Sequence, residues 1–332
     1  MTANRMTADR MTTQRQGEPA ESTVSGSGRR RAGRPSSSAV TVRVPATSAN
    51  LGPGFDSFGL ALARYDEATA ALQPEGLLVE VTGVGAGEVP LTHEHLVVRA
   101  IARAFGEGGR ELPGLRLRCT NCIPHGGGLG SSASAIVAGL LLGRELLADA
   151  GGGWLPDQRI FELGTELEGH PDNVAPALYG GFTLAFAGAD GAPVAVRRDV
   201  HPDIRIVVFS AHQASSTLHT RGLLPATVPH SDASANAAAA GLLVHAITVD
   251  PAYLLPATRD RLHQDYRAPA MPESARLVAD LREAGIAAVI SGAGPSVIAL
   301  VTGDIEADSW RRPGFDVAAV AVSTTGAQIH PD

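Results

Sequence analysis

The 332-residue sequence contains no lysine, because all 27 of its basic residues are arginine. A Walker-type phosphate loop needs a lysine that reaches the outer phosphates of a nucleotide, so a nucleotide site of that kind is excluded. The same absence excludes lysine as a catalytic base or as a Schiff-base former.

Cysteine is nearly absent, and the two that occur, Cys119 and Cys122, stand together as CTNC. Zinc usually takes four ligands, and no further cysteine and no nearby histidine pair completes such a set. Cys119 alternates with Leu115 and Leu117, so we expect its thiol to be a small core group.

Long apolar runs and strong charge of one sign are also missing. No run reaches the roughly 18 to 20 residues of a membrane span, and the N-terminus lacks the apolar core of a secretory signal. The net charge is −7, with both signs interspersed after the first forty positions, which disfavours nucleic acid and anionic membranes as partners. We expect a cytoplasmic globular protein with a small-molecule partner and neither nucleic acid nor membrane.

The order of the patterns predicts an α+β protein with two halves. Residues 1–38 are polar and contain a near-repeat (MTANR, MTADR, MTTQR), which predicts a disordered extension. Residues 39–200 form a first domain, and residues 201–332 form a second whose strands and helices suit a ferredoxin-like sandwich. The expected strands are 40–44, 59–72, 77–84, 115–122, 181–186, 204–211, 287–290, 297–301 and 317–322. The expected helices are 95–105, 132–150, 157–168, 235–247 and 274–284, with a further one around residue 218.

The stretch IPHGGGLGSSASA joins an expected strand to an expected helix. Glycines let backbone amides approach a ligand, and the unpaired amides of the first helical turn carry the positive end of the helix dipole. This favours a phosphate site between Gly126 and Ser132, although a tight connection without a ligand fits the glycines equally well. The two serines at the helix start are suited either to capping or to a metal bound to phosphate.

Three further stretches contain candidate polar groups. Glu166 carries a carboxylate of the kind magnesium prefers, but a single glutamate on a helix is usually only solvated. HPDNVAP places a histidine, a carboxylate and an amide together, which suits either a polar pocket or an Asx-type turn. SGAGPS, at 291–296, is a second glycine turn, which either touches a ligand or only supports the first loop.

Three ordered stretches, VRVPATSANLGPGFDSFGLAL, IPHGGGLGSSASAIVAGLL and ISGAGPSVIAL, resemble the motifs of the GHMP small-molecule kinases. SANLGPGFD, ELEGHPDNVAPALYGG, STLHTRGLLP and LHQDYRAPAMP resemble the homoserine kinase branch. The resemblance implies a two-domain GHMP kinase fold, with an N-terminal ribosomal protein S5 domain 2-like domain and a C-terminal ferredoxin-like sandwich. It also implies a homodimer.

The resemblance implies that ATP and Mg²⁺ bind at the first glycine loop and that L-homoserine is the phosphoryl acceptor. Ser131 and Glu166 would hold the metal. Catalytic roles would fall to Asn50, Asp56, Thr217 and Glu166. The phosphates would lie against Pro124, Gly126, Gly127, Gly128, Leu129, Gly130, Ser131 and Ser132, with Gly292 and Gly294 nearby. The acceptor would contact Asn50, Asp56, His170, Asp172, Asn173, Arg221 and Arg267.

Two alternatives remain at this stage. One is a GHMP kinase for another small alcohol, and the other is a nucleotide-binding regulator without turnover. Paired Arg221 and Arg267 favour an acceptor with a carboxylate over a sugar. Whether a side chain removes the proton of the acceptor hydroxyl is not decided by the sequence, and Asp56 and Asp172 are the carboxylates to test. The stretch SDASANAAAAGLL departs from the family in its many alanines.

Overall fold

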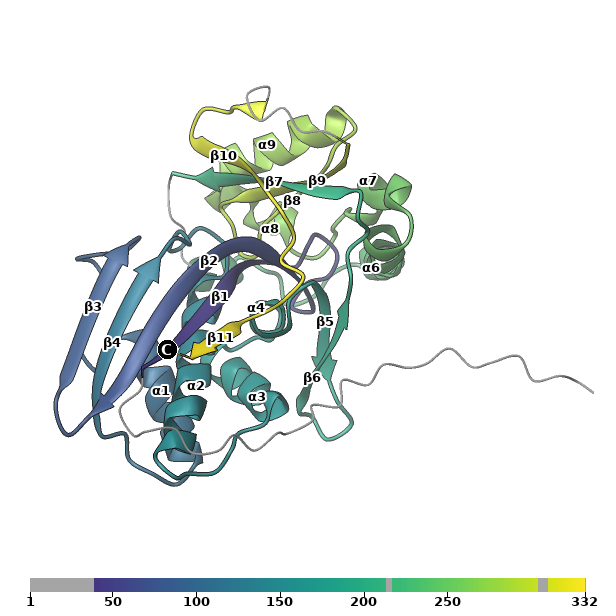
Figure 1. The fold of residues 1–332 in the computed structure, drawn as a ribbon. Coiled ribbons are helices and arrows are strands. Elements are labelled where there is room, and N and C mark those ends of the chain that lie inside the picture. The colour runs from purple at the N-terminus through teal and green to yellow at the C-terminus, as the bar shows by residue number, and fades with distance from the viewer. Residues whose placement is uncertain (1–38, 213–216, 304–309, 332) are drawn as a thin grey trace, which may run out of the picture. The chain divides into compact units, whose positions relative to one another are not determined.

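The computed structural model describes residues 39–212, 217–303 and 310–331, so the predicted extension at 1–38 lies outside the described residues. The described residues form two β-sheets with helices packed on them, which confirms the predicted α+β class (Figure 1).

The first sheet contains seven strands, most of them antiparallel. Its central strand β2 is 16 residues long and pairs with β1 along most of its length. It also pairs with β5 near its beginning and with β4 near its end. Strand β3 is parallel to β4, and α1 forms the crossover between them, as parallel pairing requires. The strands are β1 (Val40–Ala49), β2 (Phe58–Gln73), β3 (Leu77–Gly83), β4 (Gly114–Asn121), β5 (Phe182–Ala187), β6 (Pro193–Arg198) and β11 (Gln328–Pro331).

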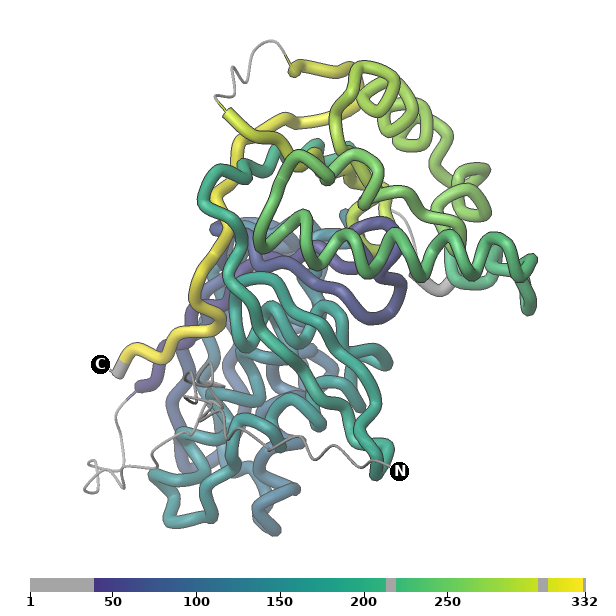
Figure 2. The backbone as a smooth tube through the Cα atoms, turned by 90° about the vertical axis from the view of Figure 1, so that its right-hand side faces the viewer, coloured from purple at the N-terminus to yellow at the C-terminus, as the bar shows by residue number. Residues whose placement is uncertain are grey.

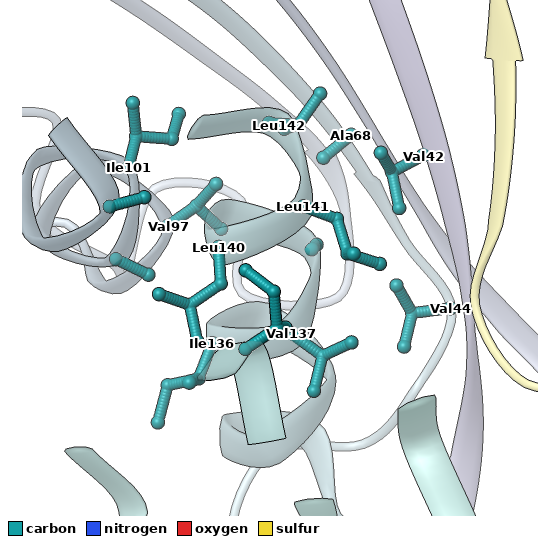
Figure 3. Close-up of a cluster of buried hydrophobic side chains, with 14 of the residues drawn as sticks. Val42, Val44, Ala68, Val97, Ile101, Ile136, Val137, Leu140, Leu141 and Leu142 are labelled. Atoms are coloured by element: carbon teal, nitrogen blue, oxygen red, sulfur yellow. The ribbon is translucent and has the colours of Figure 1, made fainter. Parts of the chain in front are cut away.

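Helix α2 (Ser131–Asp149) is the centre of the first core. Its side chains lie between α1 (Leu96–Glu107) on one side and strands β1 and β2 on the other (Figure 3). The helix is long and apolar enough to span a membrane by composition alone, but 72% of its apolar window is buried within the protein. It is a core helix, flanked further by α3 (Asp157–Glu168) and α4 (Val174–Tyr179).

The second sheet is antiparallel and has the order β10-β7-β9-β8. Helix α9 packs against β8 and β9, and α6 is followed by a series of short helices. The strands are β7 (Ile204–Ala211), β8 (Ala287–Ile290), β9 (Val297–Thr302) and β10 (Phe315–Val320). The helices are α5 (Thr217–Arg221), α6 (His230–Thr248), η1 (Pro251–Tyr253), α7 (Leu254–Ala257), α8 (Gln264–Arg267), η2 (Ala268–Ala270) and α9 (Pro272–Glu283).

The two halves are more interwoven than the sequence indicated. The sheets do change between Arg198 and Ile204, near the expected boundary, but β11 returns to the first sheet and pairs with β1 (Figure 2). A second core also draws residues from both halves, among them Leu60 and Ile206. The predicted last strand at 317–322 corresponds to β10, which ends at Val320. Pairing between opposite ends of the chain produces no local pattern in the sequence, so it could not be predicted from periodicity.

We predict that Gly139→Ala lowers the free energy of unfolding by about 1–3 kcal/mol, because overpacking a close helix contact is destabilising. A Cβ atom at Gly139 of α2 would lie 2.5 Å from the carbonyl oxygen of Val97 and 2.6 Å from Cβ of Ala100. The matched control is Gly241→Ala in α6, where nothing lies within 4 Å and the helix should gain roughly 0.5–1 kcal/mol. Urea unfolding measures the free energy of unfolding of both variants. An equal increase in Gly139→Ala and Gly241→Ala would contradict the close packing of α1 on α2.

Candidate active site

A cavity of about 720 Å³ opens where the first glycine loop meets the ends of both sheets. It is lined by most of the residues singled out in the sequence, together with several that were not. From the predicted set it includes Asn50, Asp56, Pro124, Gly126, Gly127, Gly128, Leu129, Gly130, Ser131, Ser132, His170, Asp172, Asn173, Arg221, Arg267, Gly292 and Gly294.

The amino end of α2 faces this cavity. Gly126, Gly128 and Gly130 have φ angles of 63°, 76° and 69°, a region that glycine enters without steric cost. The first hydrogen bond of the helix runs from the amide of Ser134 to the carbonyl of Gly130, so the amides of residues 131–133 precede the intrahelical ladder. The first turn contains no acidic residue, and the helix end is therefore suited to an anion.

The second glycine turn, Ser291–Ser296, packs directly on this loop. The hydroxyl of Ser291 donates to the carbonyl of Gly128 at 2.6 Å, and the amide of Ser296 donates to the carbonyl of Gly127 at 3.2 Å. A Cβ atom at Gly128 would lie 2.3 Å from the carbonyl oxygen of Ser291. The turn supports the first loop and also lines the cavity, and its contact with a ligand stays a prediction.

The opposite end of the cavity contains Asp56, whose carboxylate accepts two hydrogen bonds from the guanidinium of Arg221, at 3.0 and 2.7 Å. Asn50 orients this aspartate, because its side-chain oxygen accepts from the amide of Asp56 at 2.9 Å. Its amide group donates to the carbonyl of Gly292 at 2.8 Å. Asn50 and Asp56 have φ angles of 69° and 55°, which asparagine and aspartate adopt more readily than other side chains, and Leu51 between them has a φ of 50°, which is rare for a bulky residue.

Arg267 lies beside this pair and is only 2% exposed. Its Nη1 contacts Nδ1 of His263 at 3.2 Å and donates to the carbonyl of Gly292 at 3.3 Å, while its Nε has no partner. Across the described ranges no carboxylate lies within ion-pair distance of it. Burial, and then the nearby Arg221, lower the pKa of Arg267. A buried cation without a counter-ion is costly, and an anionic ligand would relieve that cost.

The HPDN stretch adds a linked set of polar groups between the two ends. Nδ1 of His170 lies 2.7 Å from a carboxylate oxygen of Asp172, and this hydrogen bond raises the pKa of His170. The side-chain oxygen of Asn173 accepts from the hydroxyl of Thr47 at 2.7 Å. Asp172 and Asn173 are buried, so both are held in place, as expected for a pocket wall.

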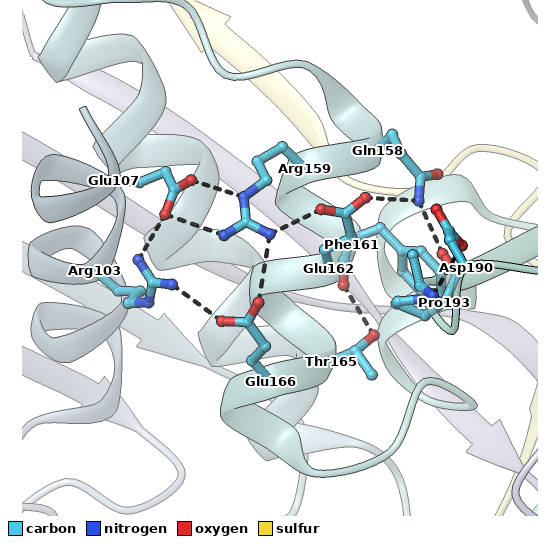
Figure 4. A network of polar contacts seen from close by, with 11 residues as sticks. Arg103, Glu107, Gln158, Arg159, Phe161, Glu162, Thr165, Glu166, Asp190 and Pro193 are labelled. Carbon is cyan, nitrogen blue, oxygen red and sulfur yellow. Dashed lines mark hydrogen bonds and ion pairs between the residues drawn. The ribbon is translucent and has the colours of Figure 1, made fainter. Parts of the chain in front are cut away.

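Glu166 does not fit its predicted role as a metal ligand. Its carboxylate pairs with Arg103 at 3.0 Å and Arg159 at 3.4 Å, within an ion-pair network between α1 and α3 (Figure 4). Half of the side chain is exposed, and it does not line the cavity.

Glu168 lies in the cavity instead, two positions along the same helix. Successive helical residues are 100° apart, so residues two positions apart point to nearly opposite sides. An oxygen of the Glu168 carboxylate accepts from the Ser132 hydroxyl at 2.6 Å, and burial raises the pKa of this carboxyl group. The sequence ELEG offered both glutamates, and nothing in it told which one faces the loop.

Other polar lining residues were also missed, among them Asp66 and His95. Asp66 of β2 accepts hydrogen bonds from the amides of Cys122 and Ile123, at 2.6 and 2.9 Å, and so anchors the start of the glycine loop. His95, at the amino end of α1, is 6% exposed, and burial lowers its pKa. The only sequence signal for Asp66 was an acidic residue within a strand. Of the predicted residues, Thr217 begins α5, but its side chain lies outside the described residues.

The exposed Cys122 and the buried Cys119 are both free thiols. In the described part of the chain no group of three or more histidine, cysteine, aspartate or glutamate side chains is arranged to hold a metal ion. Any metal in this cavity would therefore need ligands of other types, such as a hydroxyl, water or the phosphates of a substrate.

Comparison with known proteins finds two family models. Residues 95–181 match "GHMP kinases N terminal domain", and residues 250–313 match "GHMP kinases C terminal". A homoserine kinase of Streptomyces avermitilis is 49% identical, covering 88% of this chain and 96% of that protein. One of Streptomyces coelicolor is 50% identical, covering 88% and 95%. The crystal structure of homoserine kinase from Cytophaga hutchinsonii has a TM-score of 0.76 and 27% identity, covering 91% of this chain and all of that one.

We predict that His95 and His170 titrate on opposite sides of the ordinary histidine pKa of about 6.5. Burial disfavours the imidazolium of His95, whereas the hydrogen bond to Asp172 favours that of His170. Ring-proton NMR of the ligand-free protein measures both titrations. Asp172→Asn should lower the pKa of His170 and leave that of His95 in place, and an unchanged His170 titration would remove Asp172 as its partner.

Proposed function

This chain belongs to the homoserine kinases of the GHMP kinase family, and we propose how its cavity serves their reaction. The protein is an ATP-dependent kinase that phosphorylates the side-chain hydroxyl of L-homoserine to O-phospho-L-homoserine in threonine biosynthesis. Its fold is the two-domain GHMP kinase fold, with an N-terminal ribosomal protein S5 domain 2-like domain and a C-terminal ferredoxin-like sandwich.

The observation that carries the proposed mechanism is the continuity of the cavity. One region offers the unpaired amides of α2, and the same cavity reaches the buried Arg267 and the Asp56–Arg221 pair. A phosphate donor and an amino-acid acceptor would therefore meet within one enclosed space. Fixing two reactants next to each other removes much of the entropic barrier to their reaction.

The triphosphate of ATP would lie along Gly126–Ser132, where backbone amides replace the lysine that the chain lacks. The nucleoside would then extend toward the side of the cavity lined by His95, Val97 and Asn121. This direction follows from the lining, because the other side is occupied by the charged groups around Arg267.

The chemistry of Ser132 and Glu168 fits Mg²⁺, and these two residues would hold it. A hydroxyl and a carboxylate are hard oxygen donors, and magnesium usually takes only one or two carboxylates with phosphates and water as its other ligands. Burial raises the pKa of the Glu168 carboxyl group, and a cation bound next to it would favour its charged form. When bound, the ion would neutralise phosphate charge. Ser131 lines the same wall and stays a prediction.

The carboxylate of L-homoserine would bind Arg267 and Arg221, since planar guanidinium groups match carboxylates in two-point contacts. Its ammonium group would then lie next to Asp56, whose present partner is Arg221. The side-chain hydroxyl would point past His170 and Asn173 toward the phosphates. In this arrangement the acceptor inserts itself into an existing ion pair.

Phosphoryl transfer needs positioning and charge neutralisation more than covalent assistance. Asp56 is paired with Arg221 and Asp172 with His170, so we assign neither carboxylate as a dedicated base. Asn50 holds the acceptor loop through Asp56 and Gly292 and is a positioning residue here. Catalytic participation of Thr217, the cytoplasmic location and the homodimer stay predictions.

We predict that Glu168→Gln raises the magnesium concentration needed for half-maximal activity by at least about 10- to 100-fold, the loss that follows when even a group supporting a metal ligand is removed. Glu166→Gln is the matched control, two residues away on the same helix, and should keep the wild-type magnesium dependence. Steady-state rates at a series of Mg²⁺ concentrations decide between them. The reverse result would restore the assignment made from sequence.

We predict that Arg267→Ala raises KM for L-homoserine by roughly 30- to 1000-fold, the equivalent of losing about 2–4 kcal/mol of a buried carboxylate contact. KM for ATP should change little, because Arg267 lies at the acceptor side. Arg276→Ala on the exposed side of α9 is the control. An unchanged KM for L-homoserine in a folded variant would remove Arg267 from the acceptor site.

A further inference from the structure

A second cavity, of about 350 Å³, lies in the C-terminal half and shares no lining residue with the first. Its walls come from the segment between α7 and α8, from α8 and η2, from α9 and from the end of β8. The lining residues are Thr258, Arg259, Asp260, Arg261, Gln264, Asp265, Ala268, Met271, Ala275, Val278, Arg282 and Ile290.

Positive charge in this cavity is not balanced by the protein. Arg282 of α9 donates to three neutral oxygens, those of the Thr258 hydroxyl at 2.8 Å, the Leu255 carbonyl at 2.7 Å and the Ala288 carbonyl at 3.3 Å. Burial, and then the neighbouring Arg259, lower the pKa of Arg282. Within residues 39–212, 217–303 and 310–331, none of the three lining arginines, Arg259, Arg261 and Arg282, forms an ion pair with a carboxylate.

The two acids of the lining differ in availability. Asp260 accepts from the amides of Leu262, His263 and Gln264, at 2.9, 3.1 and 2.6 Å, and its side chain is 2% exposed. It is therefore committed to shaping its own loop. Asp265 is exposed, and no partner for its carboxylate is found in the described part of the chain. It is the acid that remains able to meet a cationic group.

The rest of the lining includes apolar side chains, those of Met271, Ala275, Val278 and Ile290. The cavity thus combines unbalanced arginine, one available carboxylate and an apolar wall, within a volume suited to a small molecule. We propose that this cavity is a second binding site, for a small α-amino acid with an apolar side chain. Its carboxylate would meet Arg259 and Arg282, and its ammonium group would meet Asp265.

The same segment connects this site to the acceptor end of the first cavity. His263 lies within it, with Nε2 2.9 Å from the carbonyl of Gly52 and Nδ1 in contact with Arg267. Gln264, which lines the second cavity, accepts from the amide of Ile290 at 2.7 Å, directly before the turn that supports the glycine loop. An amino acid bound at Arg259 should therefore change the affinity for L-homoserine, a consequence that rests on the proposed function.

The first test is calorimetric binding of L-leucine to the full chain. We expect binding that weakens at least about tenfold when the probe lacks its ammonium group (4-methylpentanoate) or its carboxylate (3-methylbutylamine), since each removes a charged contact. Arg259→Ser and Asp265→Asn should weaken L-leucine binding to a similar degree. Arg276→Ser, an exposed arginine of α9 outside the lining, should leave it unchanged, and thermal unfolding confirms that each variant is folded.

Absence of L-leucine binding would overturn the proposal. The proposal would also be overturned if L-leucine bound the Arg259→Ser variant as tightly as the wild type and competed with L-homoserine for a single site. L-leucine would then occupy the acceptor site. Inorganic phosphate that binds more tightly than L-leucine and is lost in Arg259→Ser would make the cavity a simple anion site and also overturn the assignment.

The second test is coupling. If the two sites are coupled, saturating L-homoserine changes the dissociation constant of L-leucine by a finite factor. Linkage then requires that L-leucine changes the dissociation constant of L-homoserine by the same factor. Unequal factors or no change would overturn the coupling. Turnover of L-homoserine by the wild-type protein is measured in parallel. Its absence would contradict the proposed function, while Arg259-dependent binding of L-leucine would still stand.

Discussion

The site depends on a junction where three segments distant in the sequence pack closely, with no space for a side chain at Gly128 or Gly130. Residues 47–50, 127–130 and 291–296 are joined by direct hydrogen bonds, such as those from Ser291 to Gly128 and from the amide of Gly292 to the carbonyl of Ala49. A Cβ atom at Gly130 would lie 1.8 Å from the hydroxyl oxygen of Thr47. This contact aims the end of α2 at the cavity and holds Asn50 against Gly292, so both ends of the site are fixed by one junction.

That junction also explains how the protein keeps unbalanced charges ready for ligands. The first turn of α2 has no acidic residue, burial raises the pKa of the Glu168 carboxyl group, and Arg267 is buried without a counter-ion. Each arrangement costs stability by itself, and the large apolar cores around α2 and β7 offset that cost. Preorganised polar groups of this kind need little rearrangement when charge arrives, which is the usual basis of electrostatic catalysis.

The sequence predicted the parts of this site that depend on local patterns. The strand–glycine–helix junction is readable because glycine spacing and apolar periodicity are local. The choice between Glu166 and Glu168 was not readable, because it depends on the rotation of α3 and on Arg103 and Arg159, which capture Glu166. The pairing of Asp56 with Arg221 bridges 165 positions, and β11 joins the sheet from the far end of the chain. Such contacts are set by topology, which periodicity does not record.

The cavity shows how anions can be bound in a chain without lysine. Backbone amides hold an anion with fixed geometry and do not titrate, and arginine stays charged over the physiological pH range. Among the titratable groups of the cavity, burial lowers the pKa of His95, whereas the hydrogen bond to Asp172 raises that of His170. Between those two pKa values His95 is neutral and His170 is protonated. The nucleoside side of the cavity therefore stays uncharged at His95, while the imidazolium of His170 offsets the carboxylate of Asp172 beside the acceptor.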